Sequence, residues 1–464
     1  MRILLIRPPR PPKAITIGEF MFCEPLGLEA VYGVLQKKHQ VTLLDMMAEQ
    51  KEEQVNIEQY LQENPPEAVG ITALCIDVTN VLELARIVKT VAAKIPVVVG
   101  GTQAQLMPQA FADPAIDYVM YQTTATGLHS LFDALAVSAN TVPNIAGILP
   151  VQEGLSNIPA KIGWQKNEYL VPDRSSCEQY RNQYSYFGYT PCALVQTSQG
   201  CSQCCSFCLR WRIEGGKEAH QDMEVIFAQI RAIHEPSIMI IDNDFLCNGE
   251  RLEQLCDFLD QEDIRKNFLC YGSVHSLLQN QESVRRFAQH GLKAVLVGYE
   301  SFQANELVGY KKKATVEDNL KAARLLQQWS VDAWASFIFH PDWDHADFRE
   351  FRRYIRRLRP EVSSLSPLTP FPGLPAFQEF EDRLLFAVQD YEQWSFGNIV
   401  IRPSRMSLRA YYAQVLLTNL EVNFFMNNVF YLVRRFGLRT LFRLTVGGIR
   451  LTLRYLAAMW RAGS

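Results

Sequence analysis

The sequence predicts an α/β protein with two parallel-sheet domains and a helical C-terminal region. Three observations support this class. Apolar runs of strand length alternate with amphipathic helical segments over residues 1–150, which favours a doubly wound, Rossmann-like sheet. A second series of such runs over residues 191–400 has the spacing of a partial β6/α6 barrel of the TIM type. Residues 401–464 have the pattern of an arginine-rich helical region, and the proline-bearing residues 151–190 connect the two sheet domains.

The first domain is expected to contain five strands with helices between them. Ligands of doubly wound sheets bind at the carboxyl ends of the strands, so the loops after the strands hold the candidate binding residues. No G-x-G-x-x-G and no P-loop is present, so a generic nucleotide-binding site is not indicated. The expected strands are 3–6, 41–44, 68–74, 97–99 and 118–120, and the expected helices are 26–38 and 81–94.

The second domain is expected to contain six strands, 193–197, 238–241, 268–271, 294–298, 333–339 and 362–366, with helices such as 224–233 and 318–329 between them. Barrel active sites lie at the carboxyl ends of the strands. Each acidic residue there could also be only a helix cap or a solvated loop residue. The polar candidates at these ends are Asp242, Asn243, Glu300, Ser301, His340 and Asp344.

Three cysteines follow the first barrel strand in the spacing C-x3-C-x2-C: Cys201, Cys205 and Cys208. Three thiolates so close in sequence can bind three irons of a cubane [4Fe–4S] cluster and leave the fourth iron open to a small molecule. The pairs Cys201/Cys204 and Cys205/Cys208 also have the spacing of two zinc half-sites. Zinc sites usually separate their pairs by a loop, and no clean second pair follows here. The spacing therefore favours a cluster, with Cys204 outside it.

This motif resembles the signature of the radical S-adenosylmethionine (SAM) superfamily, which usually carries an aromatic residue at the position of Phe207. The resemblance implies that Cys201, Cys205 and Cys208 hold a catalytic [4Fe–4S] cluster whose open iron binds SAM. The ammonium and ribose hydroxyls of SAM need hydrogen-bond acceptors, and its carboxylate needs donors. The expected SAM contacts are Phe207, Asp242, Asn243, Glu300 and Ser301.

The first domain resembles the cobalamin-binding domain that precedes many radical SAM domains. The resemblance rests on Leu-Leu-Ile-Arg-Pro-Pro near the N-terminus, Pro25-Leu26-Gly27-Leu28, Val97-Val98-Val99-Gly100-Gly101 and Ile116-Asp117-Tyr118-Val119. It implies bound cobalamin with these contacts: Pro25, Leu26, Gly27, Thr72, Ala73, Leu74, Cys75, Gly100, Gly101, Thr102, Gln103, Gln122 and Thr123.

The chain departs from that family in two loops. Thr102-Gln103-Ala104 replaces a Pro-His-Ala-like triplet, and Gln122-Thr123-Thr124-Ala125 replaces Gly-Glu-Gly-Glu. No Asp-x-His-x-x-Gly is present, so no histidine ligand beneath cobalt is expected. Cys75 lies in the loop expected to face the lower side of the corrin, although a core-facing cysteine is an alternative interpretation of it.

Residues 234–245, 262–272, 341–344 and 370–373 resemble the hopanoid C-3 methylase branch of these enzymes, and the likeness extends over roughly residues 1–430. It implies methylation of an unactivated carbon on an apolar, lipid- or isoprenoid-like substrate. SAM would charge cobalamin to methylcobalamin, and a second SAM, cleaved with an electron from a donor such as flavodoxin or ferredoxin, would activate the carbon. Two alternatives stay open: cyclisation or rearrangement of a tetrapyrrole or natural-product intermediate, and a non-catalytic cobalamin sensor with a structural cluster.

Charge is distributed unevenly along the chain. Residues 405–464 contain nine arginines, no lysine and one acidic residue, so they carry +8 and the remainder of the −3 chain carries −11. Such asymmetry indicates a surface for an anionic partner. Eleven cysteines without a signal-peptide pattern favour a reducing, cytoplasmic setting.

The C-terminal region is expected to be helical, with a break at Gly447-Gly448. One helical face is predicted to carry Arg435, Arg439, Arg443, Arg450, Arg454 and Arg461. No uncharged run approaches the ~20 residues of a transmembrane span. Two interpretations stay open: a cap docked on the barrel with its charged side in water, and an amphipathic helix lying on the cytoplasmic face of an anionic membrane. No nucleic-acid-binding motif is present, so a nucleic-acid partner is not expected.

Overall fold

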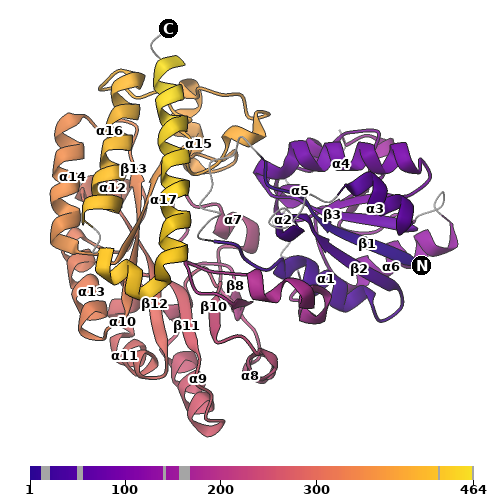
Figure 1. The fold of residues 1–464 in the computed structure, drawn as a ribbon, viewed down its shortest axis with the longest axis horizontal. Coiled ribbons are helices and arrows are strands. Elements are labelled where there is room, and N and C mark those ends of the chain that lie inside the picture. The colour runs from indigo at the N-terminus through magenta and orange to yellow at the C-terminus, as the bar shows by residue number, and fades with distance from the viewer. Residues whose placement is uncertain (12–20, 50–55, 139–142, 156–167, 427–428, 462–464) are drawn as a thin grey trace.

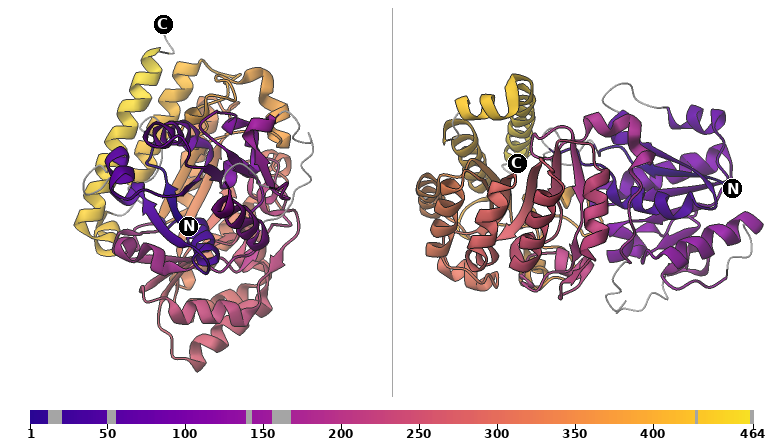
Figure 2. Two further views of the ribbon diagram at one scale, coloured as in Figure 1. Left: turned by 90° about the vertical axis from the view of Figure 1, so that its right-hand side faces the viewer. Right: turned by 90° about the horizontal axis from the view of Figure 1, so that it is seen from below.

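The computed structural model describes residues 1–11, 21–49, 56–138, 143–155, 168–426 and 429–461. Two α/β bodies lie side by side, and the short helix α7 (Arg210–Glu214) lies between them (Figure 1). A view from below shows the same arrangement, with the N-terminal body beside the larger C-terminal one (Figure 2). Any site at the ends of both sets of strands can therefore be shared between the two bodies.

The N-terminal body is a six-stranded sheet in the order β2-β1-β3-β4-β5-β6, with helices on both faces. Its first five strands are parallel and β6 is antiparallel to β5. The strands are β1 (Arg2–Arg7), β2 (Gln40–Asp45), β3 (Ala68–Thr72), β4 (Val97–Gly100), β5 (Tyr118–Met120) and β6 (Ile148–Pro150). The helices are α1 (Leu26–Leu35), α2 (Met46–Glu49), α3 (Ile57–Glu63), α4 (Val78–Val91), α5 (Thr102–Leu106) and α6 (Ala125–Val137), with 3-10 turns η1 (Cys75–Asp77) and η2 (Pro108–Phe111).

Burial on both faces explains why the strands of this sheet are apolar throughout. In β1, Leu4 and Ile6 pack into the core cluster that includes α3 and α4, whereas Ile3 and Leu5 pack into the one that includes α1 and α6. The predicted doubly wound sheet is confirmed. Its strand order 2-1-3-4-5 is the flavodoxin-like variant, which places the ligand crevice at the carboxyl ends of β1 and β3, where the order reverses.

The C-terminal body contains six parallel strands in the order β14-β13-β12-β11-β10-β7, with β7 and β14 as its two edges. This confirms the predicted partial barrel. The strands are β7 (Cys192–Val195), β10 (Ser237–Ile240), β11 (Asn267–Ser273), β12 (Leu292–Glu300), β13 (Asp332–Phe339) and β14 (Val362–Pro367). The helices are α8 (Met223–Ala232), α9 (Gly249–Gln261), α10 (Val274–Gln279), α11 (Gln281–Gln289), α12 (Ala304–Gly309), α13 (Val316–Gln328) and α14 (His345–Leu358), with a 3-10 turn η6 (Phe245–Cys247).

The described end of the connector packs against the barrel strands. Aromatic side chains of Tyr186, Phe187 and Tyr189 lie in one apolar cluster with strand residues, among them Leu194 and Trp334. The ring centroids of Phe187 and Trp334 are 4.1 Å apart. The described connector also contains the 3-10 turns η3 (Val151–Glu153) and η5 (Arg174–Gln183).

The C-terminal region packs on the barrel as helices, as expected, but the predicted break is wrong. The helix α17 (Val429–Arg461) passes through Gly447 and Gly448, and its non-helical residue is Gly437, with φ 75° and ψ 162°. The two glycines stay helical because the flanking Leu441 and Leu451 pack against the barrel's apolar clusters. The other elements are α15 (Pro375–Phe380), η7 (Glu381–Arg383), η8 (Tyr391–Gln393), α16 (Leu408–Leu420) and η9 (Glu421–Met426). Across the residues that the structure describes, no helix has the length and apolar character needed to cross a membrane.

Candidate active site between the two domains

The three motif cysteines lie in a loop between β7 and α7 that the backbone holds in place. The short strand β8 (Ser198–Gln199) pairs with β9 (Ala219–His220) and closes the loop. The amide of Cys201 donates a hydrogen bond to the carbonyl of Gly215 (3.0 Å), and the indole N–H of Trp211 donates to the carbonyl of Cys205 (2.9 Å). These contacts fix the loop before any ligand binds.

The thiols of this loop are buried close to one another. Burial raises the pKa of Cys201 to about 12 and that of Cys205 to about 11, and it also raises the pKa of Cys208. The charges of Cys205 and Cys208 further raise the pKa of Cys201, and that of Cys208 raises the pKa of Cys205, so a positive counter-charge is needed to hold these thiols ionised. Iron ions supply such a charge, because metal binding displaces the thiol proton.

Cys204 differs from the other motif cysteines in its local geometry. It adopts a left-handed backbone conformation with φ 47°, and its thiol lies 3.6 Å from the carbonyl oxygen of Cys201. In the described part of the chain, no three His, Cys, Asp or Glu side chains are arranged around a single metal ion. The assignment of the cluster to Cys201, Cys205 and Cys208 stays a prediction.

Asp242, predicted to contact SAM, lies in a buried and hydrogen-bonded position. Its side chain is 1% exposed, and its carboxylate accepts hydrogen bonds from the amide and hydroxyl of Thr197 and from the hydroxyl of Ser198, each 2.6 Å long. These partners lie at the start of the cysteine loop. The oxygens of Asp242 thus anchor that loop to β10, and its contact with SAM stays a prediction.

Asn243 and Arg210 form a polar pair at the end of β10. The Asn243 amide donates to the carbonyl of Gly200 (3.1 Å) and to Glu214 (2.8 Å), and its oxygen accepts from Arg210 Nε (2.5 Å). Arg210 also donates to the carbonyl of Ile241 (3.1 Å). A guanidinium is thus held two residues after the last motif cysteine.

Glu300 and Lys312 form a buried ion pair near the cysteine loop. Lys312 Nζ lies 3.3 Å from Glu300 Oε1, and each side chain is 10% exposed. A register shift between β12 and β13 and a φ of 61° turn Glu300 inward, and its carboxylate folds back over Gly298, where a side chain would have no room. Burial raises the pKa of Glu300, whereas the charge of Glu300 raises that of Lys312 despite its burial. The pair lies close enough to Cys205 for the Lys312 charge to lower that thiol's pKa.

Three other strand-end candidates have structural partners of their own. Ser301 is fully buried and its hydroxyl donates a hydrogen bond to Glu306, and its contact with SAM stays a prediction. Asp344 caps α14 by accepting hydrogen bonds from the amides of Ala346 (2.7 Å) and Asp347 (3.1 Å), which confirms the helix-cap interpretation. His340 is half-buried between aromatic rings, and burial lowers its pKa.

A cavity of about 390 Å³ lies between the two bodies. The strand-end loops of the first sheet form one wall, and residues beside the cysteine loop form the other, including Gln199, Arg210 and Ile213. Eight of the thirteen predicted cobalamin contacts line it: Leu26, Gly27, Thr72, Leu74, Gly100, Gly101, Thr102 and Thr123. Five do not: Pro25, Ala73, Cys75, Gln103 and Gln122. Ala73, for example, is fully buried in the core beneath the loop.

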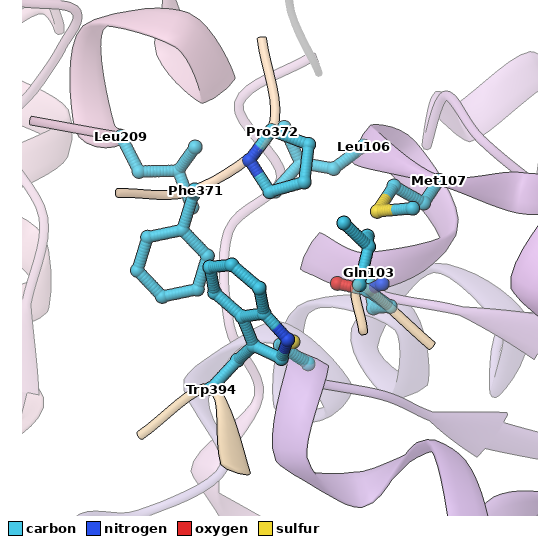
Figure 3. A pocket seen from close by; sticks show the side chains of 9 residues that line it. Gln103, Leu106, Met107, Leu209, Phe371, Pro372 and Trp394 are labelled. Atoms are coloured by element: carbon cyan, nitrogen blue, oxygen red, sulfur yellow. The ribbon is translucent and has the colours of Figure 1, made fainter. Parts of the chain in front are cut away.

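A smaller, mainly apolar pocket lies at another part of the same junction. Figure 3 shows Leu209, Phe371, Pro372 and Trp394 from the barrel side facing Gln103, Leu106 and Met107 from the first domain. Cys75 also lines this pocket, packed among its apolar residues, and burial raises its pKa to about 12. Gln103 is 2% exposed, and its amide nitrogen has no hydrogen-bond partner. The pocket thus contains one unsatisfied buried donor among apolar side chains.

Comparison with known proteins identifies both bodies. Residues 18–131 match the B12 binding domain family, and residues 195–355 match the radical SAM superfamily. The chain therefore contains a B12 binding domain followed by a radical SAM domain. The family predicted from the cysteine motif and the first domain is thereby confirmed, together with its cofactors cobalamin, SAM and a [4Fe–4S] cluster.

Individual relatives of this radical SAM enzyme differ in activity. The hopanoid C-3 methylase of Methylococcus capsulatus is 25% identical over 338 residues, which cover 71% of this chain and only 63% of that protein. The anaerobic magnesium-protoporphyrin IX monomethyl ester cyclase of Rubrivivax gelatinosus is 24% identical over 384 residues, 79% of this chain and 67% of that protein. The radical SAM methyltransferase TsrM from Kitasatospora setae, solved with cobalamin and a [4Fe-4S] cluster, shares the fold with a TM-score of 0.68 at 15% identity, covering 90% of each chain.

Two residues of this enzyme's site were missed by sequence reasoning. Lys312 stands in the run Lys311-Lys312-Lys313, which has the pattern of a solvated charged loop. Arg210 follows the motif by two positions, and that proximity was the only signal available for it. Both enter the site through partners distant in sequence, Glu300 and Asn243.

Proposed function

We propose that this enzyme transfers a methyl group to an unactivated carbon of an apolar, lipid- or isoprenoid-like substrate. One observation carries the proposal: a single cavity of about 390 Å³ is bordered both by the strand-end loops of the B12 binding domain and by residues beside the cysteine loop. Methyl transfer from cobalamin to a substrate carbon requires that both cofactors reach one substrate.

We assign the cluster to Cys201, Cys205 and Cys208. When bound, the cluster supplies the electron that cleaves SAM, and cobalamin supplies the methyl group. The protein's own task at this loop is to hold three thiolates in a dry setting, with Asp242 fixing the start of the loop and Trp211 its centre. A flavodoxin or ferredoxin is the class of partner that would reduce the cluster.

For SAM we propose polar contacts from Glu300, Asn243 and Arg210, and an apolar contact from Phe207. Glu300 offers carboxylate oxygens to an ammonium or a ribose hydroxyl, and Arg210 offers donors to a carboxylate. Lys312 is a positioning residue, because it holds the Glu300 carboxylate at 3.3 Å and its charge opposes the burial that raises the pKa of Glu300. Phe207 packs edge-on against Tyr310 at 5.2 Å and presents an apolar surface beside the motif.

For cobalamin we propose the eight cavity-lining residues already named. A large planar ligand can approach the protein closely only where side chains are small. The cavity wall offers such places at Thr72, Gly100 and Gly101. No histidine is among the described residues that line the cavity. The proposed mode of binding is therefore one in which the protein gives cobalt no imidazole ligand.

For the substrate we propose a position against the apolar residues of the smaller pocket at the junction, because the pocket itself has a volume of about 20 Å³ and is too small to hold it. Its aliphatic and aromatic lining favours an apolar body and excludes water from a carbon radical. The side-chain amide nitrogen of Gln103 has no hydrogen-bond partner, and leaving a buried donor unpaired costs free energy. This favours a substrate that carries one hydrogen-bond acceptor beside its apolar part.

The test is anaerobic incubation of cobalamin-loaded enzyme with SAM, a strong reductant and membrane-lipid extract. We expect 5′-deoxyadenosine and repeated formation of S-adenosylhomocysteine from the wild type and from Cys204→Ala. From Cys201→Ala, Cys205→Ala or Cys208→Ala we expect no 5′-deoxyadenosine and at most one S-adenosylhomocysteine per cobalamin, because charging cobalamin does not use the cluster. Deoxyadenosine without S-adenosylhomocysteine would favour the cyclisation suggested by the Rubrivivax relative. Failure of an iron- and SAM-loaded enzyme to form either product would favour a sensor.

A further inference from the structure

The helix α17 exposes a continuous apolar stripe to solvent. Of the thirteen large apolar side chains that are exposed in the described structure, six lie on this helix. Phe442 is 71% exposed and Trp460 is 79% exposed. The six are Leu438, Phe442, Ile449, Leu453, Leu456 and Trp460. Exposed apolar residues are usually scattered singly, so a concentration on one helix requires its own explanation.

These six residues lie on one side of the helix. Their spacings of four, seven, four, three and four positions keep them within about 60° of arc at ~100° per residue. They all follow Gly437, where the helix changes direction, so they belong to one straight segment. At ~1.5 Å per residue the stripe is about 33 Å long.

The stripe is separate from the face that packs on the barrel. Tyr455 is 4% exposed, and its hydroxyl donates to the carbonyl of Gly397 (2.6 Å). Leu441 and Leu451 pack into the barrel's apolar clusters. The helix is therefore already anchored, as its position along α16 shows (Figure 1), and its apolar stripe is left over from that packing.

Arginines run beside the stripe. Five of its six residues are followed at once by an arginine, in Leu438-Arg439, Phe442-Arg443, Ile449-Arg450, Leu453-Arg454 and Trp460-Arg461. The side chains of Arg435, Arg439 and Arg443 lie outside the described set, whereas Arg450, Arg454 and Arg461 are exposed. One position corresponds to about 100° around the helix, so the arginines flank the stripe. No acidic residue occurs between 422 and 464.

We propose that this face of α17 binds the surface of an anionic lipid bilayer, with the stripe in the headgroup–acyl boundary and the arginines on lipid phosphates. An apolar stripe with an arginine flank and a terminal tryptophan is the composition of interfacial helices. Residues 1–404 carry a net charge of −11, so an anionic bilayer repels them and favours an orientation in which α17 faces the lipid. Symmetrical pairing with a second copy would instead bring two arginine rows together, and RNA would leave the apolar stripe uncovered.

The test is flotation of the full-length protein with vesicles of phosphatidylglycerol and phosphatidylcholine, compared with phosphatidylcholine alone. We expect binding to the anionic vesicles that weakens in high salt. The triple variant Phe442→Ser, Leu453→Ser, Trp460→Ser should bind at least about tenfold more weakly. The variant Arg450→Gln, Arg454→Gln, Arg461→Gln should lose the preference for anionic lipid. Val137→Ser, which changes a valine that is 89% exposed on the first domain, is the matched control and should bind like the wild type.

Three results would overturn the proposal. One is equal binding of the wild type and the triple serine variant to anionic vesicles. A second is the absence of vesicle binding together with a concentration-dependent dimer that Phe442→Ser abolishes, which would make the stripe a subunit interface. The third is retention of an RNA oligonucleotide that requires the arginines and not the apolar residues. These readouts do not use the catalytic activity, so they stand independently of the proposed function.

Discussion

Replacing Gly101 by alanine is expected to damage the cobalamin site more than its size suggests. Gly101 has φ 93° and ψ −175°, a region of backbone space that is essentially restricted to glycine. A Cβ there would lie 2.7 Å from Thr72 Oγ1 and 2.9 Å from both the nitrogen and the oxygen of Ala73. Real Cβ atoms do not approach other heavy atoms within 3.0 Å, and Ala73 contributes backbone rather than a flexible side chain.

The expected loss of stability can be worked out from the backbone strain at Gly101 and the displacement of Ala73. Backbone strain contributes about 1–3 kcal/mol. Displacing Ala73 also weakens two hydrogen bonds of 3.0 Å, one between its amide and the Gly100 carbonyl and one between its carbonyl and the Gln103 amide, at about 0.5–1.5 kcal/mol each. We therefore expect the Gly101→Ala variant to lose about 2–6 kcal/mol of unfolding free energy. Because these loops also line the cavity, cobalamin affinity should fall at least about tenfold.

Two matched variants isolate the cause. Gly437→Ala imposes similar backbone strain far from the cavity with no atom within 4 Å of the added Cβ, so it should lower stability and leave cobalamin affinity unchanged. Gly27→Ala adds a Cβ on the cavity wall with no protein atom within 4 Å, so it should leave the stability almost unchanged and lower cobalamin affinity through the added Cβ alone. Chemical denaturation measures the stability, and titration followed by visible absorbance measures cobalamin binding. If Gly101→Ala bound cobalamin as tightly as the wild type, the assignment of the β3 and β4 loops to this cofactor would be refuted.

Three further outcomes are expected. Lys312→Met should lower the free energy of unfolding by about 3–5 kcal/mol, because it leaves the Glu300 carboxylate buried without a partner. Adding Glu300→Gln should recover part of the loss. If the effects of the two substitutions were additive in this double-mutant cycle, the two side chains would not be coupled. Burial raises the pKa of Glu361 to about 7, although its carboxylate accepts a hydrogen bond from the Ala333 amide. The protonated Glu361 side chain therefore stabilises the fold fully below about pH 4.5, and this contribution is lost as the pH rises through about 7. Glu361→Gln should therefore match the wild type in acid and become more stable by up to about 3 kcal/mol above pH 7; a constant difference across that window would contradict this. Reduced, bound cobalamin should show no nitrogen coupling from a histidine in its electron paramagnetic resonance spectrum, and such a coupling would place an imidazole beneath cobalt.

The sequence by itself determined the chemistry that local spacing encodes. Cys201, Cys205 and Cys208 lie within eight positions, so their grouping needs no tertiary structure. Strand–helix alternation likewise depends on short-range periodicity, which is why both parallel sheets could be predicted. The failed helix break shows the limit of such signals, since the apolar packing of Leu441 and Leu451 overrides the low helix propensity of Gly447 and Gly448.

Only the tertiary structure decided which polar residues are free to act. Asp242 and Asp344 resemble site residues in the sequence, yet hydrogen bonds to Thr197 and to the first turn of α14 occupy them. Lys312 resembles a solvated residue, yet an inward turn at Glu300 gives it a buried partner. The helix α17 has two apolar faces in the sequence, and only its packing on the barrel determines which of them is buried. The physical reason is that the burial and pairing of a polar group depend on residues distant in sequence, which no local pattern records.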